Sequence, residues 1–211
     1  MGTTVIVDYG SGNVFSVARA LETAGASVLL SDAPDTIANA DRLVLPGVGA
    51  FGAAWNLLVE KNLIEPIRKF IGTERPFLGI CVGMQMMMQR SEEFGDHTGL
   101  GIIEGVVKKI SGTRADGEPH PVPRVGWYTM TRRQASWSGT LFETIDESGA
   151  VYFVHSFAAQ PSDSRNVLAD SEYNGASITA AVIRDNAVGV QFHPEKSGHV
   201  GLRMMEKFIS L

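Results

Sequence analysis

Apolar runs and segments with helical spacing alternate along the first part of the chain. Short apolar runs predict β-strands at 3–9, 27–31, 42–46 and 76–80. The segments between and after these runs predict helices at 14–25, at 53–72 with an interruption near Pro66, and at 83–90. Because the strands are apolar throughout and are separated by helices, they indicate a parallel sheet with helices on both faces.

The pattern changes after residue 100. Short β-branched segments divided by Gly, Pro, Asn and Asp predict further, mostly antiparallel strands at 102–110, 122–130, 150–158, 166–171, 177–183 and 187–192. A last helix is predicted at 201–211. We therefore expect an α/β fold in which a central, mostly parallel sheet is flanked by helices. In the C-terminal half, antiparallel strands extend this sheet or form a second small one.

Length, charge and composition narrow the class of protein. A chain of 211 residues is expected to form one domain, 1–211. Its net charge of -5 is spread along the sequence, which does not favour nucleic-acid binding. We recognise no signal peptide and no membrane-spanning segment, and a single cysteine favours a reducing compartment. A cytoplasmic protein is expected, with no cofactor and, because the histidines lack the spacing of a metal cluster, no metal.

The one cysteine, Cys81, lies between two glycines in GICVGMQ, directly after the predicted strand 76–80. The form G-x-C-x-G between a strand and a helix is typical of a nucleophile elbow, a sharp turn that presents a reactive side chain. Gly79 and Gly83 would relieve crowding in such a turn, and the N-terminus of the next helix favours thiolate over thiol. Alone, this pattern leaves open a buried structural cysteine at the end of a strand.

A base for this nucleophile is indicated near the C-terminus, in VQFHPEKSG. His193 and Glu195 are two residues apart, so the carboxylate can hold the imidazole in position. His155, in YFVHSF, is the competing base. It lies in a strongly apolar strand with no acid close behind it, and we interpret it as a structural histidine.

A glycine-rich stretch, LPGVGAF, follows the predicted strand 42–46. Gly47 and Gly49 flank Val48, and backbone N–H groups in such a turn can point at an anion. With the N–H of Val82, the residue after the cysteine, they could form an oxyanion hole. An ordinary strand-to-helix turn is the alternative.

Together, these three motifs resemble those of the class I glutamine amidotransferases, the triad-type glutaminases. GICVGMQ is close to the family's G-x-C-x-G-x-Q elbow, and FHPE is close to its His-Pro-Glu element. Within the family, the sequence is similar to glutaminase subunits of imidazole glycerol phosphate synthase, from histidine biosynthesis. The stretches that carry this similarity are DYGSGNVFSVARALE, LPGVGAF, GICVGMQ, VGWYTM, YFVHSF and QFHPEKSG, from residue 8 to 198. The resemblance implies the flavodoxin-like fold of that class.

The resemblance implies glutamine hydrolysis through a cysteinyl thioester. Cys81 would attack the side-chain amide carbon, His193 would move the protons, and Glu195 would orient His193. The implied oxyanion donors are Val48 or Gly49, together with Val82. The implied substrate-binding residues are Gly47, Gly49, Gln85, Ser156 and Phe157.

The resemblance also implies a heterodimer with a (β/α)8 cyclase subunit, which would receive the ammonia and make imidazole glycerol phosphate and aminoimidazole carboxamide ribotide. The implied interface residues are Asn13, Trp127 and Lys196. A solvated surface residue is the alternative for Lys196. The stretch around Trp127 departs from the family, which commonly has Pro-His-Met before Gly-Trp and Asn after it. Here the stretch is PRVGWY, so the docking contacts are expected to differ. The usual leucine after the nucleophile is Val82 here, where only the backbone is needed.

Other functions remain possible on the sequence alone. A glutaminase of the same class could serve a pyridoxal phosphate or anthranilate synthase, but DYGSGN and PGVGAF argue against it. A stand-alone thiol hydrolase or peptidase is disfavoured by Gln85 and the His-Pro-Glu element. A non-catalytic docking subunit would be expected to lose the nucleophile or the base, and this chain keeps both.

Overall fold

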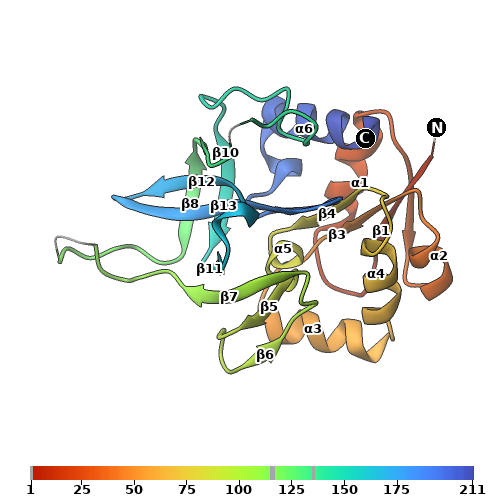
Figure 1. Cartoon of the computed structure of the whole chain (residues 1–211), viewed down its shortest axis with the longest axis horizontal. Coiled ribbons are helices and arrows are strands. Elements are labelled where there is room, and N and C mark those ends of the chain that lie inside the picture. The colour runs from red at the N-terminus through yellow and green to blue at the C-terminus, as the bar shows by residue number, and fades with distance from the viewer. Residues whose placement is uncertain (1, 115–116, 135) are drawn as a thin grey trace.

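A computed structural model of the chain describes residues 2–114, 117–134 and 136–211, and its main feature is an eight-stranded sheet (Figure 1). The strand order is β2 (Ser27–Ser31), β1 (Thr3–Val7), β3 (Arg42–Leu45), β4 (Phe77–Ile80), β14 (Ala187–Val190), β13 (Ala176–Arg184), β12 (Val167–Tyr173) and β9 (Thr131–Arg132). The strands from β2 to β14 in this order are parallel, and those from β13 onward are antiparallel. This confirms the predicted parallel sheet and its antiparallel extension. The order 2-1-3-4 followed by β14 is that of flavodoxin-like folds, whose ligands bind at the carboxyl ends of the strands.

Helices cover the parallel part of the sheet on both sides. They are α1 (Val14–Thr23), α2 (Pro34–Ala38), α3 (Phe51–Glu60), α4 (Ile64–Ile71), α5 (Val82–Met86) and α6 (Gly198–Ser210), with short 3-10 helices η1 (Ser164–Asn166) and η2 (Pro194–Lys196). Helices α1 and α6 lie on one side, and α3 and α4 on the other (Figure 1). The core packs side chains from both halves of the chain, from Val5 to Phe208. No helix in the described ranges is long and apolar enough to cross a membrane.

Two smaller sheets lie beside the main one. One pairs β8 (Arg124–Tyr128) with β10 (Val151–His155), and the other has the order β11 (Phe157–Pro161), β7 (Ile103–Lys109), β5 (Met88–Ser91) and β6 (His97–Thr98). The prediction of one strand at 150–158 was therefore wrong: it is divided at Ser156, where the chain leaves one sheet and enters the other.

The predicted helix breaks also need correction. The helix expected at 53–72 is interrupted at Asn62, whose φ is 57°, and not near Pro66. Pro66 lies in the first turn of α4, where a missing N–H leaves no helical hydrogen bond unmade. The helix expected at 83–90 ends at Met86, and the chain continues as strand β5 from Met88.

Candidate active site

Cys81 lies at the carboxyl end of β4, immediately before α5, in a sharp backbone turn. Its φ is 54° and its ψ is -109°, a conformation that costs a non-glycine residue energy and that clusters at functional sites. The Cys81 N–H donates to the carbonyl of Val190 on the neighbouring strand, at 2.8 Å, which holds the turn in place. The cysteine therefore has the strained geometry that the G-x-C-x-G pattern predicts.

The glycines on either side of Cys81 are required by close packing. A Cβ at Gly79 would lie 2.8 Å from the carbonyl oxygen of Gly83, and a Cβ at Gly83 would overlap the carbonyl oxygen of Leu45. Neither contact involves a flexible side chain that could move aside. Gly79 therefore lets β4 approach α5, and Gly83 lets α5 approach β3.

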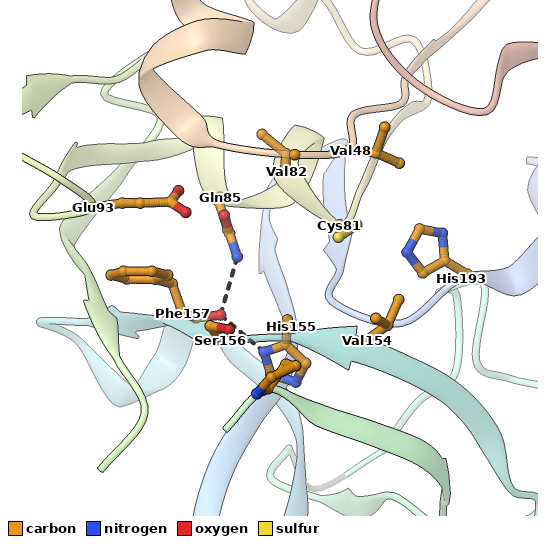
Figure 2. Close-up of a pocket in the computed structure, with 12 residues that line it drawn as sticks. Val48, Cys81, Val82, Gln85, Glu93, Val154, His155, Ser156, Phe157 and His193 are labelled. Atoms are coloured by element: carbon orange, nitrogen blue, oxygen red, sulfur yellow. Dashed lines mark hydrogen bonds between the residues drawn. The ribbon is translucent and has the colours of Figure 1, made fainter. Parts of the chain in front are cut away.

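His193 follows β14 and brings an imidazole to the same edge of the sheet. Its Nδ1–H donates to Oε1 of Glu195 at 2.8 Å, and both side chains are almost fully buried. On the other side, the ring faces the sulfur of Cys81 (Figure 2). Burial alone would lower the pKa of His193, but its interactions with Cys81 and Glu195 outweigh burial and raise this pKa to about 9.

His155 lines the same cavity but has different chemistry. Its Nδ1–H donates to the carbonyl of Phe157 at 2.8 Å, and Nε2 has no hydrogen-bond partner. Burial lowers the pKa of His155 to about 4; the Phe157 carbonyl opposes this shift, and the nearby Arg124 guanidinium adds to it. A neutral, buried imidazole held by a backbone carbonyl fits the structural role that the sequence suggested.

The cavity in front of Cys81 has a volume of ≈ 310 Å³. Its lining residues are Val48, Gly49, Cys81, Val82, Gln85, Glu93, Pro123, Val154, His155, Ser156, Phe157 and His193. Figure 2 shows their side chains converging from the ends of several strands and loops. The structure thus brings together most of the predicted site residues. Among the described residues, no group of His, Cys, Asp and Glu is arranged to hold a metal ion.

A chain of amides connects the cavity wall to the nucleophile. The Nε2 group of Gln85 donates to the carbonyl of Phe157 at 3.1 Å and to Oε1 of Gln191 at 3.0 Å. Gln191 in turn donates through Nε2 to the sulfur of Cys81, at 3.7 Å. Sequence reasoning missed Gln191. The available signal was a polar amide at the end of an apolar strand, two residues before the proposed base.

Glu93 is a second residue that the sequence analysis did not single out. Its side chain lines the cavity and is largely buried, and its Oε2 accepts the N–H of Phe51 at 2.7 Å. Burial raises the pKa of this carboxyl, although the Phe51 N–H works in the opposite direction. A carboxylate thus faces the cavity opposite the catalytic side (Figure 2).

Of the predicted oxyanion donors, Val48 and Gly49 lie in the loop between β3 and α3, and Val82 is the first residue of α5, directly after Cys81. Val48 and Gly49 line the cavity, and the φ of Gly49 is +85°, a value that glycine adopts readily. The Val82 N–H donates to the carbonyl of Gly47 at 3.4 Å. Gly47 itself does not line the cavity, because it packs against Tyr9 and Val82.

The residues predicted at the partner interface are spread around this edge of the sheet. Trp127 is 54% exposed on β8, and its ring meets the edge of Tyr152 on β10. Lys196 is exposed in η2, with its Nζ 5.9 Å from the ring centre of the same Tyr152. Asn13 is half-buried in the loop between β1 and α1.

The comparison with known families agrees with this fold. Residues 5–210 match the family model described as "Glutamine amidotransferase class-I". The chain therefore belongs to the class I glutamine amidotransferases, which confirms the predicted fold class and the predicted glutaminase chemistry. The roles of the individual residues stay predictions.

The chain is also similar to individual relatives along almost all of its length. It is 47% identical to "Imidazole glycerol phosphate synthase subunit HisH 1" of Legionella pneumophila (strain Lens), over 100% of both chains. It is 44% identical to the HisH subunit of Syntrophotalea carbinolica, over 97% of this chain and 98% of that one. Among solved structures, PurLQS from Thermotoga maritima matches with a TM-score of 0.75 at 18% identity, over 100% of this chain and 99% of that one. The last likeness concerns the fold alone.

Proposed function

We propose that this chain is the glutaminase subunit of an imidazole glycerol phosphate synthase and supplies that enzyme with ammonia for histidine biosynthesis. The observation that carries the chemistry is one cavity in which the strained Cys81 faces the hydrogen-bonded pair His193 and Glu195. Similarity to HisH subunits over the whole chain supports the choice of synthase.

In this proposal the nucleophile is the sulfur of Cys81. The interactions with Cys81 and Glu195 raise the pKa of His193 to about 9, so the imidazole is a base that can take the thiol proton and keep it at neutral pH. The sulfur attacks the side-chain amide carbon of glutamine. As the carbon–nitrogen bond breaks, His193 gives its proton to the nitrogen, which leaves as ammonia. His193 then takes a proton from water, the water oxygen attacks the thioester carbon, and glutamate leaves as the carbon–sulfur bond breaks.

Each attack places negative charge on the former amide oxygen, which needs backbone donors. We assign this role to the N–H of Val82 with that of Val48 or Gly49. The Val82 N–H donates to the Gly47 carbonyl, so this carbonyl has to rotate away before the donor can reach the substrate. Losing one such donor typically costs about 100-fold or more in rate.

We assign substrate recognition to the cavity wall that lies opposite His193. We assign the α-carboxylate of glutamine to the backbone around Ser156 and Phe157, and its α-ammonium group to the carboxylate of Glu93. Gln85 holds this wall in place through its hydrogen bond to Phe157. A buried carboxylate that faces the cavity is well suited to an ammonium ligand because the ligand supplies the opposite charge.

The partner surface is proposed to surround the mouth of this cavity. Two of the residues that line the cavity, Val48 and Val154, are 41% and 37% exposed. On β8, Val125 and Trp127 are 50% and 54% exposed, and Val125 pairs with Val154 on β10. Exposed aromatic and aliphatic groups around a site are typical of a docking surface. The cationic Lys196 beside Tyr152 could then pair with a carboxylate of the cyclase subunit.

The experiment compares two nitrogen sources in the complex with the cyclase subunit. In Cys81→Ala, synthesis from glutamine should fall by roughly 10⁴-fold or more, whereas synthesis from added ammonium salts should be unchanged. Retained glutaminase activity would rule out the assignment of Cys81. Hydrolysis of peptides or esters without any partner would instead support a stand-alone hydrolase.

A further inference from the structure

The cavity in front of Cys81, here called the glutamine cavity, is bordered by Phe157, the first residue of β11. A second cavity lies next to the following residues of β11. Its volume is ≈ 240 Å³, and it is enclosed by β7, β11, the start of β13 and the loop at 111–114 and 120. Its floor contains Ile110, Ala158 and Ile178, which belong to a small buried cluster separate from the main core. Pockets for drug-sized ligands are larger, about 300–1,000 Å³, so this cavity suits a small molecule or ion.

The charged groups that line this cavity are all basic. They include Lys108, Lys109 and Arg114, and none of the described residues in the lining is an aspartate or a glutamate. Lys108 lies 3.9 Å from Glu92, but both side chains are well exposed, so this pair neutralises little. In the described part of the chain, Lys109 and Arg114 form no ion pair of their own. The described lining of the cavity therefore carries net positive charge.

His120 supplies a second and independent indication of a ligand. Its side chain lines the cavity and is only 4% exposed, yet neither Nδ1 nor Nε2 has a hydrogen-bond partner. The residue is held firmly: its ring lies on Tyr173 at 4.4 Å between centroids, and its backbone N–H donates to the carbonyl of Gly112 at 2.8 Å. A fixed, buried polar group without a partner is costly, and a bound ligand would remove that cost.

We propose that this cavity binds a small oxyanion of the phosphate class, either free or as the head of an organic phosphate. Arg114, Lys108 and Lys109 supply positive charge, and His120 donates a ring N–H to one of the anion's oxygens. Lysine and arginine side chains have donors and no acceptors, so the charged lining is complementary to an acceptor-rich anion. The site is separate from the glutamine cavity and does not depend on the glutaminase function.

Inorganic phosphate is the first probe, and the ring resonances of the five histidines in the chain report where it binds. Titration followed by carbon–proton NMR should shift the resonances of His120 in a saturable way and leave those of His97 and His199 in place. Saturable shifts at His193 or His155 in place of His120 would put the anion in the glutamine cavity and overturn the proposal.

Two variants and a matched control test whether Arg114 and His120 bind phosphate. Arg114→Met and His120→Phe, which keeps a ring on Tyr173, should each weaken phosphate binding about tenfold or more in calorimetry. Lys69→Met removes one exposed positive charge from α4 and should leave the affinity unchanged. Equal affinities in Arg114→Met, His120→Phe and the parent chain would overturn the proposal, and so would an equal loss in Lys69→Met.

A last comparison separates the two sources of the anion. Glycerol phosphate presents the same head group with a short organic body that can contact the floor at Ile110 and Ile178. Tighter binding of glycerol phosphate than of inorganic phosphate would identify an organic phosphate as the ligand, and equal binding would identify the free anion. Failure of both to bind at millimolar concentration would overturn the proposal.

Discussion

The side-chain amide of Gln191 donates a hydrogen bond to the sulfur of Cys81, with 3.7 Å between Nε2 and Sγ. The same side chain accepts from Gln85, so its orientation is fixed by a fully buried partner. An N–H that points at sulfur stabilises the thiolate more than the thiol because the charged acceptor forms the stronger bond. Gln191 is therefore placed to position the nucleophile and to favour its reactive form.

We predict that Gln191→Glu slows the reactions of the Cys81 sulfur, although the glutamine and glutamate side chains are nearly isosteric. The substitution replaces the donor by an oxygen, which repels the thiolate. Alkylation of Cys81 by iodoacetamide should shift to higher pH, and kcat should fall about 10-fold or more while KM for glutamine changes little. Gln191→Asn, which keeps an N–H on a shorter side chain, should recover part of the rate. An alkylation profile in Gln191→Glu identical to that of the parent chain would contradict the prediction.

His155 should make the fold sensitive to acid. Its folded pKa is about 4 and its unfolded value is 6.5, so between these values the unfolded chain binds more protons and stability is lost as the pH falls. Between pH 7 and 4.5, the free energy of unfolding measured in urea should fall by about 2–3 kcal/mol less in His155→Gln than in the parent chain. The variant should retain glutaminase activity, whereas His193→Gln should lose nearly all of it. Equal acid sensitivity in the parent chain and His155→Gln would argue against a neutral buried imidazole.

Gly83→Ala should destabilise the protein because its new methyl group meets the backbone of β3. Overpacking typically costs about 1–3 kcal/mol, and here the obstacle is a carbonyl oxygen that no side-chain rotation can move. Gly112→Ala is the matched control: its φ is not in the left-handed region, and a Cβ there would meet nothing within 4 Å. Urea unfolding should show a loss in Gly83→Ala and almost no change in Gly112→Ala. Similar stabilities of the two variants would contradict the packing argument.

Trp127 should be a major contact in the complex with the cyclase subunit. Its exposed ring on β8 can insert into the partner, and truncation of an aromatic anchor typically costs about 2 kcal/mol or more. Titration calorimetry should therefore show about 30-fold weaker binding for Trp127→Ala. Lys196→Ala should weaken binding or raise the ratio of glutamine hydrolysed to product formed. Leu29→Ala, at an exposed position on β2, should change neither quantity. Unchanged affinity in Trp127→Ala would place the interface elsewhere.

The sequence predicted those features that depend on neighbours along the chain. Cys81 between its glycines and the His193–Glu195 spacing were recognisable because each motif is local. Gln191 and Glu93 were missed because their roles depend on contacts with residues about a hundred and about forty positions away, Cys81 and Phe51. The parallel strands and their antiparallel extension followed from the hydrophobic pattern for the same local reason.

The division of the predicted strand 150–158 could not be seen in that pattern. Apolar residues continue through Ser156 without a glycine or proline, and only the pairing partners, β8 on one side and β7 on the other, show that the chain changes sheets. The break at Asn62 was misplaced for a related reason. Proline is a strong helix breaker in the interior of a helix but is tolerated in the first turn, and the sequence did not show where that turn begins.

The lone cysteine has a consequence for oxidative chemistry. A thiolate that reacts with peroxide becomes a sulfenic acid, and many thiol proteins protect this form by condensing it with a second cysteine of the same chain. Cys81 is the only cysteine in this chain, so no such internal disulfide can form. Repair of the oxidised sulfur therefore depends on a thiol from outside, such as a small-molecule reductant, and without one the next step to sulfinic acid is irreversible.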